Sequence, residues 1–154
     1  MATPLEPGVF TKLFAELAVQ AEAKATAAIT AAAVLVQERA IQSVSARTHT
    51  RRSKTPARPG GPPAMVSGTL AKSITHSTAV SESGGIQIKV GMSSALTAPY
   101  SKTRASLVAK YLEIDGAGKS RVKYPFLGPA FEQTAHAAME TTFRAVFSTG
   151  WVGL

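Results

Sequence analysis

Residues Arg47–Val66 read RTHTRRSKTPARPGGPPAMV, and this stretch divides the chain into two dissimilar parts. Its prolines and glycines oppose both a helix and a central strand, because proline lacks a backbone donor and fixes φ while glycine widens the backbone's choice. The residues before it have the pattern of one long helix, and those after it the pattern of a compact mixed region. We therefore expect an extended, exposed arm that joins the two parts.

The arm is also strongly cationic. It contains five Lys/Arg residues, and no Asp or Glu lies between Glu38 and Glu82 to neutralise them. Loops of more than about 12–15 residues are often linkers, so a solvated linker is one interpretation. The other is an arm that contacts a neighbouring subunit or the phosphates of a nucleic acid. The cations concerned are Arg47, Arg51, Arg52, Lys54 and Arg58.

The residues before the arm, Val9 to about Ser45, predict one continuous helix. Phe10, Leu13 and Leu17 follow the i, i+3, i+7 spacing of a single helical face, and Phe14 belongs to the same stripe. The middle of this segment is almost all alanine, which favours the helix but offers little side chain to bury. It could pack on its own domain or lie against a neighbouring subunit.

After the arm, SGTLAKSI (residues 67–74) predicts a short helix in which Leu70 and Ile74 are buried together and Ser67 or Thr69 is the N-cap. Two β-branched runs, 75–81 and 86–92, flank the turn sequence ESGG at 82–85 and predict an antiparallel hairpin. The run LVAKYLEI (residues 107–114) is apolar enough to enter the core, and we treat residues 113 and 115 as alternate positions of a strand.

The last helix should begin at Pro129, which suits a first turn because proline's missing N–H costs nothing there, and end near Phe147. Its expected inner face comprises Phe131, Ala135, Ala138, Met139, Thr142, Phe143 and Val146. The fold class is therefore α+β, with a long N-terminal helix, a small antiparallel sheet with a hairpin, and a C-terminal helix packed on the sheet. Residues 1–154 form a single domain, with the arm at 47–66.

Composition restricts the function. The chain has 154 residues and a formal net charge of +8, which favours a polyanionic neighbour. Without the arm's five cations, however, twelve Lys/Arg face nine Asp/Glu, so the remainder is only mildly basic. No cysteine is present, which excludes disulfides, zinc–thiolate sites and cysteine nucleophiles. No apolar run reaches about eighteen residues, so we expect a soluble protein made in the cytoplasm, with no membrane contact.

The sequence shows no catalytic constellation. His49, His76 and His136 are isolated and lack metal-ligand spacing. Glu113 and Asp115 are more simply explained as solvated turn acids or as partners of Lys110 and Lys119. The GAGKS stretch at 116–120 lacks the earlier glycine of a phosphate-binding loop. We therefore predict no enzyme activity, no cofactor and no metal.

Three motifs in fixed order carry a resemblance. They are SGTLAKSI (67–74) after a long helix and a proline-containing arm, AKYLEIDG (109–116), and PFLGPAF (125–131), which opens the last helix. Together they resemble the neck and tail-completion proteins of long-tailed bacteriophages, which are small head-to-tail joining proteins. The middle motif departs from the family in its Ala-Lys-Tyr order and in Asp115. The matching positions are Gly68, Leu70, Ile74, Tyr111, Glu113, Gly116, Pro125, Phe126, Leu127, Pro129 and Ala130.

This resemblance implies a structural component of the virion neck. Such subunits form a ring, commonly of six copies, between a portal-side connector or head-closure protein and a tail terminator or tail tube protein. DNA passes through the lumen, where the arm could touch its phosphates or clasp the next copy. A homomeric ring repeats one heterologous interface until it closes. The alternative function is a free basic nucleic-acid-binding protein.

Overall fold

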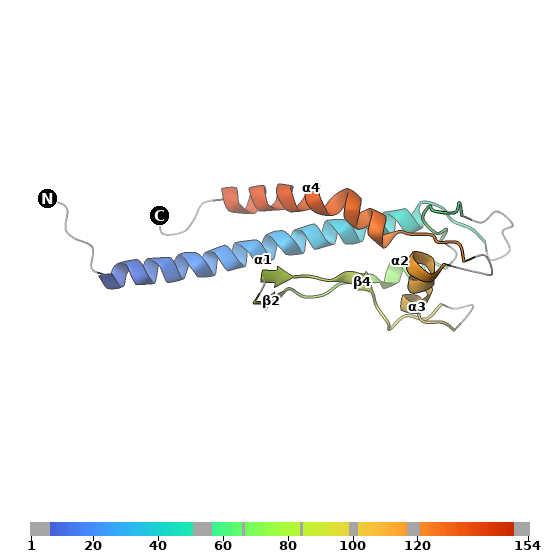
Figure 1. The fold of residues 1–154 in the computed structure, drawn as a ribbon, viewed down its shortest axis with the longest axis horizontal. Coiled ribbons are helices and arrows are strands. Elements are labelled where there is room, and N and C mark those ends of the chain that lie inside the picture. Colours follow the sequence, from blue (N-terminus) through green and yellow to red (C-terminus); the bar gives the residue numbers. More distant parts are fainter. Residues whose placement is uncertain are drawn as a thin grey trace.

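The structure is a computed structural model. It describes residues 7–50, 57–65, 67–83, 85–98, 102–116 and 121–149. A long helix, two pairs of short strands and a second long helix form an α+β fold, as the sequence predicts (Figure 1). In chain order the elements are α1 (Pro7–Ser45), α2 (Thr69–Ser73), β1 (Ile74–His76), β2 (Val80–Glu82), β3 (Gly85–Gln87), β4 (Val90–Met92), α3 (Ala105–Lys110), the π-helical turn η1 (Tyr111–Asp115) and α4 (Leu127–Ser148).

Helix α1 is the central layer of the molecule. Helix α4 runs antiparallel along one side of it, and the strands lie on its other side (Figure 1). The C-terminal helix therefore packs chiefly on α1, which lies between it and the strands. We expected this helix to pack directly on the sheet. The alanines explain this arrangement, because their small side chains let a second helix approach closely along α1.

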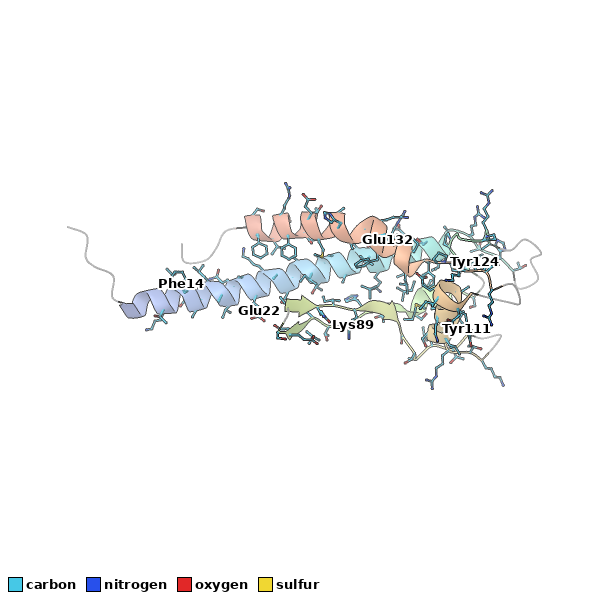
Figure 2. The ribbon with its side chains drawn as sticks, in the orientation of Figure 1. Phe14, Glu22, Lys89, Tyr111, Tyr124 and Glu132 are labelled. Atoms are coloured by element: carbon cyan, nitrogen blue, oxygen red, sulfur yellow. The ribbon has the colours of Figure 1, made fainter. Side chains whose placement is uncertain are left out.

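Polar contacts mark both ends of the α1–α4 contact. Near the end of α4, the Lys24 ammonium donates to the carbonyl oxygens of Val146 (3.1 Å) and Thr149 (2.7 Å). Near the start of α4, Arg39 Nη2 donates to Gln133 Oε1 at 2.9 Å. Helix α1 continues past the last turn of α4 toward its own N-terminus, and Phe14 lies on this projecting part (Figure 2).

The predicted hairpin exists, but an extra residue divides it into two ladders. Strand β1 pairs with β4 so that His76 faces Val90, whereas β2 pairs with β3 so that Val80 faces Gln87. The first strand thus has three residues (77–79) where the second has two (88–89), which is the arrangement of a β-bulge. At this point Ser77 donates its N–H to the Lys89 carbonyl at 2.8 Å and accepts the Lys89 N–H on its hydroxyl at 3.0 Å.

A polar side chain of α1 also links this helix to the base of the hairpin. Gln37 Nε2 donates to the Ile74 carbonyl at 3.0 Å, and its Oε1 is hydrogen-bonded to Nδ1 of His76. This contact gives the His76 ring a structural partner on α1.

The segment after the hairpin is helical, so the treatment of residues 113 and 115 as alternate positions of a strand is wrong. Helix α3 and the turn η1 cover residues 105–115. A short apolar run fits a strand or a buried helix equally well, and only its neighbours decide between them. Here Ala105 and Ala109 pack inward, four residues apart as on a helix. The expected ion pair of Lys110 is confirmed, because its Nζ lies 3.6 Å from Asp115 Oδ2.

The core is small and built largely of alanine. One cluster of buried residues joins α1, β1, α3 and the start of α4, and Phe126 is its largest member at 1% exposure. The predicted joint burial of Leu70 and Ile74 is confirmed in part, since Ile74 is a buried member of this cluster and Leu70 is half-buried against it. Its buried members are Ala40, Val44, Ile74, Ala109, Phe126 and Ala130.

Several large apolar side chains are left on the surface. Phe131 is 60% exposed and Met139 is 46% exposed, so two members of the predicted inner face of α4 lack cover, while Ala138 is buried. On α1, Phe14 is 65% exposed, although we placed it in the buried stripe. Phe14 lies on the part of α1 that projects past the end of α4 (Figure 2). Helical spacing alone therefore does not decide which of these side chains is buried.

By length and composition, Thr11–Ser45 is also a candidate membrane span, a property shared by core helices of soluble proteins and by signal sequences. In this structure its inner side packs against α4 and the hairpin base.

The described part of the arm is more ordered than we expected. Ala57 and Pro63 are buried, Met65 donates its N–H to the Arg47 carbonyl at 2.7 Å, and Gly60 donates its N–H to the Lys123 carbonyl at 3.0 Å. The prediction of a wholly exposed arm is therefore wrong for residues 57–65. Proline rings can pack against apolar neighbours even though they cannot join a ladder.

Candidate functional site

Glu113 connects two of the sequence motifs. Its carboxylate accepts backbone N–H groups at the start of α4, with Oε2 2.8 Å from the Phe126 nitrogen and 3.3 Å from that of Leu127, and Oε1 2.7 Å from that of Gly128. The first turn of a helix has N–H groups without intrahelical partners, and negative charge is favoured there. Glu113 therefore acts as a cap for α4 from a distant position in the chain.

The absence of a side chain at Gly128 permits this contact. A Cβ atom built there would lie 3.0 Å from Glu113 Oε1, which is closer than most Cβ contacts. Proline at position 129 fits beside the cap for the reason already evident from the sequence, because a first-turn proline has no N–H to satisfy. The PFLGPA segment is thus shaped to receive a carboxylate.

Gly116 ends η1 and holds the other side of this junction. Its φ is +81°, in the left-handed region, and a Cβ atom there would overlap the Arg121 carbonyl group. The chain therefore returns from residue 121 directly over Gly116. This return leads into Tyr124, whose N–H donates to the Leu112 carbonyl at 2.8 Å, and on to Phe126.

A matched pair of glycine variants tests this close approach. Gly116→Ala should lower the free energy of unfolding by about 2 kcal/mol, because it adds a steric clash to the left-handed strain. Gly60→Ala shares the strain, with φ +77°, but has no atom within 4 Å of the added Cβ. It should cost only about 1 kcal/mol in urea titrations. Equal losses would contradict the close approach at Gly116.

The remaining motif residues differ in how far they are buried. Leu70, Ile74, Phe126, Leu127 and Ala130 belong to or pack on the buried cluster, so the first and third motifs meet in the core. Tyr111 is 44% exposed, with no packing role that explains it. Pro125 and Pro129 are half-buried at the start of α4.

Helix α2 begins differently from the prediction. Gly68, not Ser67 or Thr69, is the N-cap residue, with φ +72°, and no side chain caps the helix. Ser67 Oγ accepts the Thr69 N–H only at 3.4 Å. Gly68 is in the left-handed region, where glycine has no Cβ penalty, and this explains the glycine of the first motif.

The cations named from the sequence are only partly described. Arg47 and Arg58 are exposed. Arg51, Arg52 and Lys54 lie outside the described residues. The backbone contact between Gly60 and Lys123 brings a second basic segment, which includes Arg121, beside Arg58. No periodic pattern indicates this neighbourhood, because the two segments are about sixty residues apart in the chain.

Within the described part of the chain, no group of three or more His, Cys, Asp or Glu side chains is placed to hold a metal ion. Glu113 is occupied by three backbone N–H groups, and Asp115 by Lys110. The arrangement is thus a structural junction. It orders one end of the molecule, where the arm, the motif segments and the start of α4 meet.

The long-range cap of Glu113 could not be found from spacing. The only available signal was the resemblance, which selected Glu113, Gly116 and the PFLGPA segment without giving them a physical role. Comparisons of this chain with protein-family models, with curated proteins and with solved structures found no significant match.

Proposed function

We propose that this chain is a structural subunit of the neck of a long-tailed bacteriophage. Copies of it form a ring, of six subunits by the resemblance, that joins the DNA-filled head to the tail and lets DNA pass. Its neighbours are a portal-side connector or head-closure protein on one side and a tail terminator or tail tube protein on the other. The proposal rests on the resemblance in sequence together with the placement of the motifs.

The observation that carries most weight is the convergence of the three motifs at one junction. Glu113 of the middle motif caps the helix that PFLGPA opens, and Ile74 of the first motif packs in the same cluster as Phe126. Motifs that match by chance have no reason to share one set of contacts. Their convergence supports a common origin with proteins that carry all three.

The surface supports self-association. Leu107 (41% exposed), Tyr111 (44%) and Ile114 (60%) follow one another along α3 and η1 at spacings of four and three residues. Residues at such spacings share a helical face, so these side chains form an exposed apolar stripe. Together with the small core, this stripe favours a subunit that completes its burial against other copies, since exposed apolar patches often mark interfaces.

The first test is the native mass of the purified chain. Six copies of the 16.0 kDa chain would give a particle of about 96 kDa with a central hole in negative-stain images. The double variant Leu107→Glu, Ile114→Glu should shift the mass toward that of the single chain while helix content is retained. The control Gln87→Glu, Thr141→Glu adds the same charge at exposed polar positions and should keep the mass of the parent.

The second test places the chain in the virion. A phage that encodes it, with its gene interrupted, should accumulate DNA-filled heads and free tails. Joined, infectious particles in the absence of the chain, or a protein that stays a single chain at every concentration and with every neck partner, would overturn the proposal.

A free basic nucleic-acid-binding protein is the second candidate, and its support is the net charge of +8. Salt separates the two candidates. A free binder should remain a single chain and lose DNA steeply as salt rises, because binding releases counterions. A ring subunit should keep its assembly over the same range and bind DNA weakly as a single subunit.

A further inference from the structure

We propose that one end of the subunit is a nucleic-acid phosphate-binding surface formed by Arg47, Arg58, Arg121 and Lys123, which we call the basic end. The inference rests on the proposed function, in which DNA passes through the ring. It adds which face of the subunit contacts the DNA. It also names DNA, and not a neighbouring copy, as the partner of these cations.

The four residues come from three segments that the fold brings together. Arg47 follows α1, and its carbonyl accepts the Met65 N–H at 2.7 Å. Arg58 begins a turn in which its carbonyl accepts the Gly61 N–H at 3.0 Å. Gly60, in the same turn, donates its N–H to the Lys123 carbonyl. The end of α1, residues 57–65 and residues 121–126 run together at the end of the molecule marked by Tyr124 (Figures 1 and 2).

All four side chains are exposed and lack an acidic partner among the described residues. The ion pairs found there are those of Lys110 with Asp115 and of Arg144 with Glu140. Exposed cations without a counter-charge can bind an external anion. They also repel one another, and a polyanion would remove that repulsion.

The four cations of the basic end equal most of the excess positive charge of the described residues. These residues include thirteen Lys/Arg and eight Asp/Glu. Removing the four cations of the basic end leaves nine against eight, so the rest of the described surface is nearly neutral. Cations that outnumber the acids on one part of a surface steer a polyanion toward that part.

The described residues of a second copy offer few unpaired acids to match these cations. Of the eight described acids, Glu113 is bound by backbone N–H groups, and Asp115 and Glu140 are paired with cations. The others belong to three different elements, α1, β2 and α4. They are Glu16, Glu22, Glu38, Glu82 and Glu132.

A nucleic-acid backbone does supply the matching negative charge. Duplex DNA carries about one negative charge per 1.7 Å of its axis, so cations spread over one end of a subunit each find a phosphate. Arginine is well suited to this role because its planar guanidinium matches the phosphate oxygens. Such contacts carry no base information, so the surface should bind duplexes without regard to sequence.

The neighbouring cations Arg51, Arg52, Lys54 and Lys119 belong to the same stretches of sequence and lie outside the described residues. The basic end is defined without them, and the test leaves them unchanged.

The test compares two variants that each lack four of the cations. One carries Arg47→Gln, Arg58→Gln, Arg121→Gln and Lys123→Gln. The control carries Lys12→Gln, Lys89→Gln, Lys102→Gln and Arg104→Gln, all exposed positions outside the basic end. Binding to a duplex of about 40 base pairs is followed by fluorescence anisotropy from about 50 to 300 mM salt, with the native mass of each protein measured in parallel.

Removing the basic end should weaken binding at least about tenfold and lower the slope of log K against log salt by about one unit for each phosphate that the protein no longer neutralises. The control should stay within about twofold of the parent. Equally weakened binding in both variants would show that net charge alone matters, and unchanged binding in both would show that DNA does not bind there. Either result overturns the basic end as a phosphate surface.

The parallel mass measurement keeps the two proposals separate. A ring that persists in the basic-end variant while DNA binding falls supports both. A parent protein that never assembles refutes the ring, yet the comparison of the two variants still decides the DNA surface. A basic-end variant that binds DNA like its parent but no longer joins heads to tails would assign these cations to an acidic protein and overturn the inference.

Discussion

Replacing Phe126 by alanine should lower the free energy of unfolding by about 3–5 kcal/mol. Phe126 is 1% exposed and is the largest side chain of the buried cluster, whose other fully buried members are mostly alanine. Small, already close-packed neighbours cannot move into the space left by the ring, so a cavity remains. Urea unfolding at a fixed chain concentration gives the difference, since assembly would otherwise contribute.

Phe131→Ala is the matched control, with the same atoms removed five residues further along the chain. Phe131 is 60% exposed, so its replacement should change the free energy of unfolding by less than about 1 kcal/mol. Similar destabilisation by the two variants would contradict the placement of Phe126 as the centre of the core. A large effect of Phe131→Ala alone, found only in the assembled state, would instead place this ring in a contact between subunits.

Glu113→Gln should lower the free energy of unfolding by about 3 kcal/mol. The substitution keeps the size of the side chain but removes the charge and turns one acceptor into an NH₂ group. That group would face either the Gly128 N–H, whose nitrogen is now 2.7 Å from Oε1, or the Phe126 N–H, whose nitrogen is now 2.8 Å from Oε2. Donors left without acceptors at a partly buried helix start are costly.

The control for charge is Glu132→Gln, an exposed position on α4 with the same chemical change. Its expected effect on unfolding is below about 0.5 kcal/mol. Circular dichroism during the urea titration reports whether removal of the cap also shortens the helix. Equal midpoints for the two variants would mean that Glu113 does not hold the start of α4.

Much of the helical framework was predictable because its signals are local. Alanine propensity and the apolar stripe indicated the course of α1 and its end at Ser45, and Pro129 indicated the start of α4 to within two residues. Periodicity could not predict which of the inner side chains are buried. The spacing assigned Phe131 and Met139 to the inner face of α4, but both are exposed, because burial depends on which residues of other elements lie opposite.

The segments between the two long helices show where local signals fail. LVAKYLEI fits a strand by composition, and its helical form depends on Ala105 and Ala109 packing onto the core. The hairpin was predictable from its turn and alternation, but the bulge at Ser77 changes the register by one residue, which an alternating pattern conceals. The contact of Gly60 with Lys123 depends on tertiary structure alone.

The candidate junction was predictable only as a set of residues. The sequence pattern assigned Glu113 to a solvated turn, and the resemblance marked it as a motif position. Neither indicated that its carboxylate binds N–H groups of residues 126–128. A cap is recognisable in sequence when its acceptor is adjacent to the helix. Here the acceptor comes from another element, so only the folded chain brings the two together.

The part of α1 that projects beyond Lys24 unfolds locally more easily than the packed part of the same continuous helix. From Ala28 to Val44 its inner residues are part of the packed interior, so exchange of their amide hydrogens requires disruption of most of the protein. Toward Phe14 and Val19, which are 65% and 69% exposed, the turns depend mainly on alanine's intrinsic preference, which holds short isolated helices only marginally. The helix can therefore unwind from its N-terminal end while the fold stays intact, and whatever later covers these turns must supply the free energy that keeps them wound.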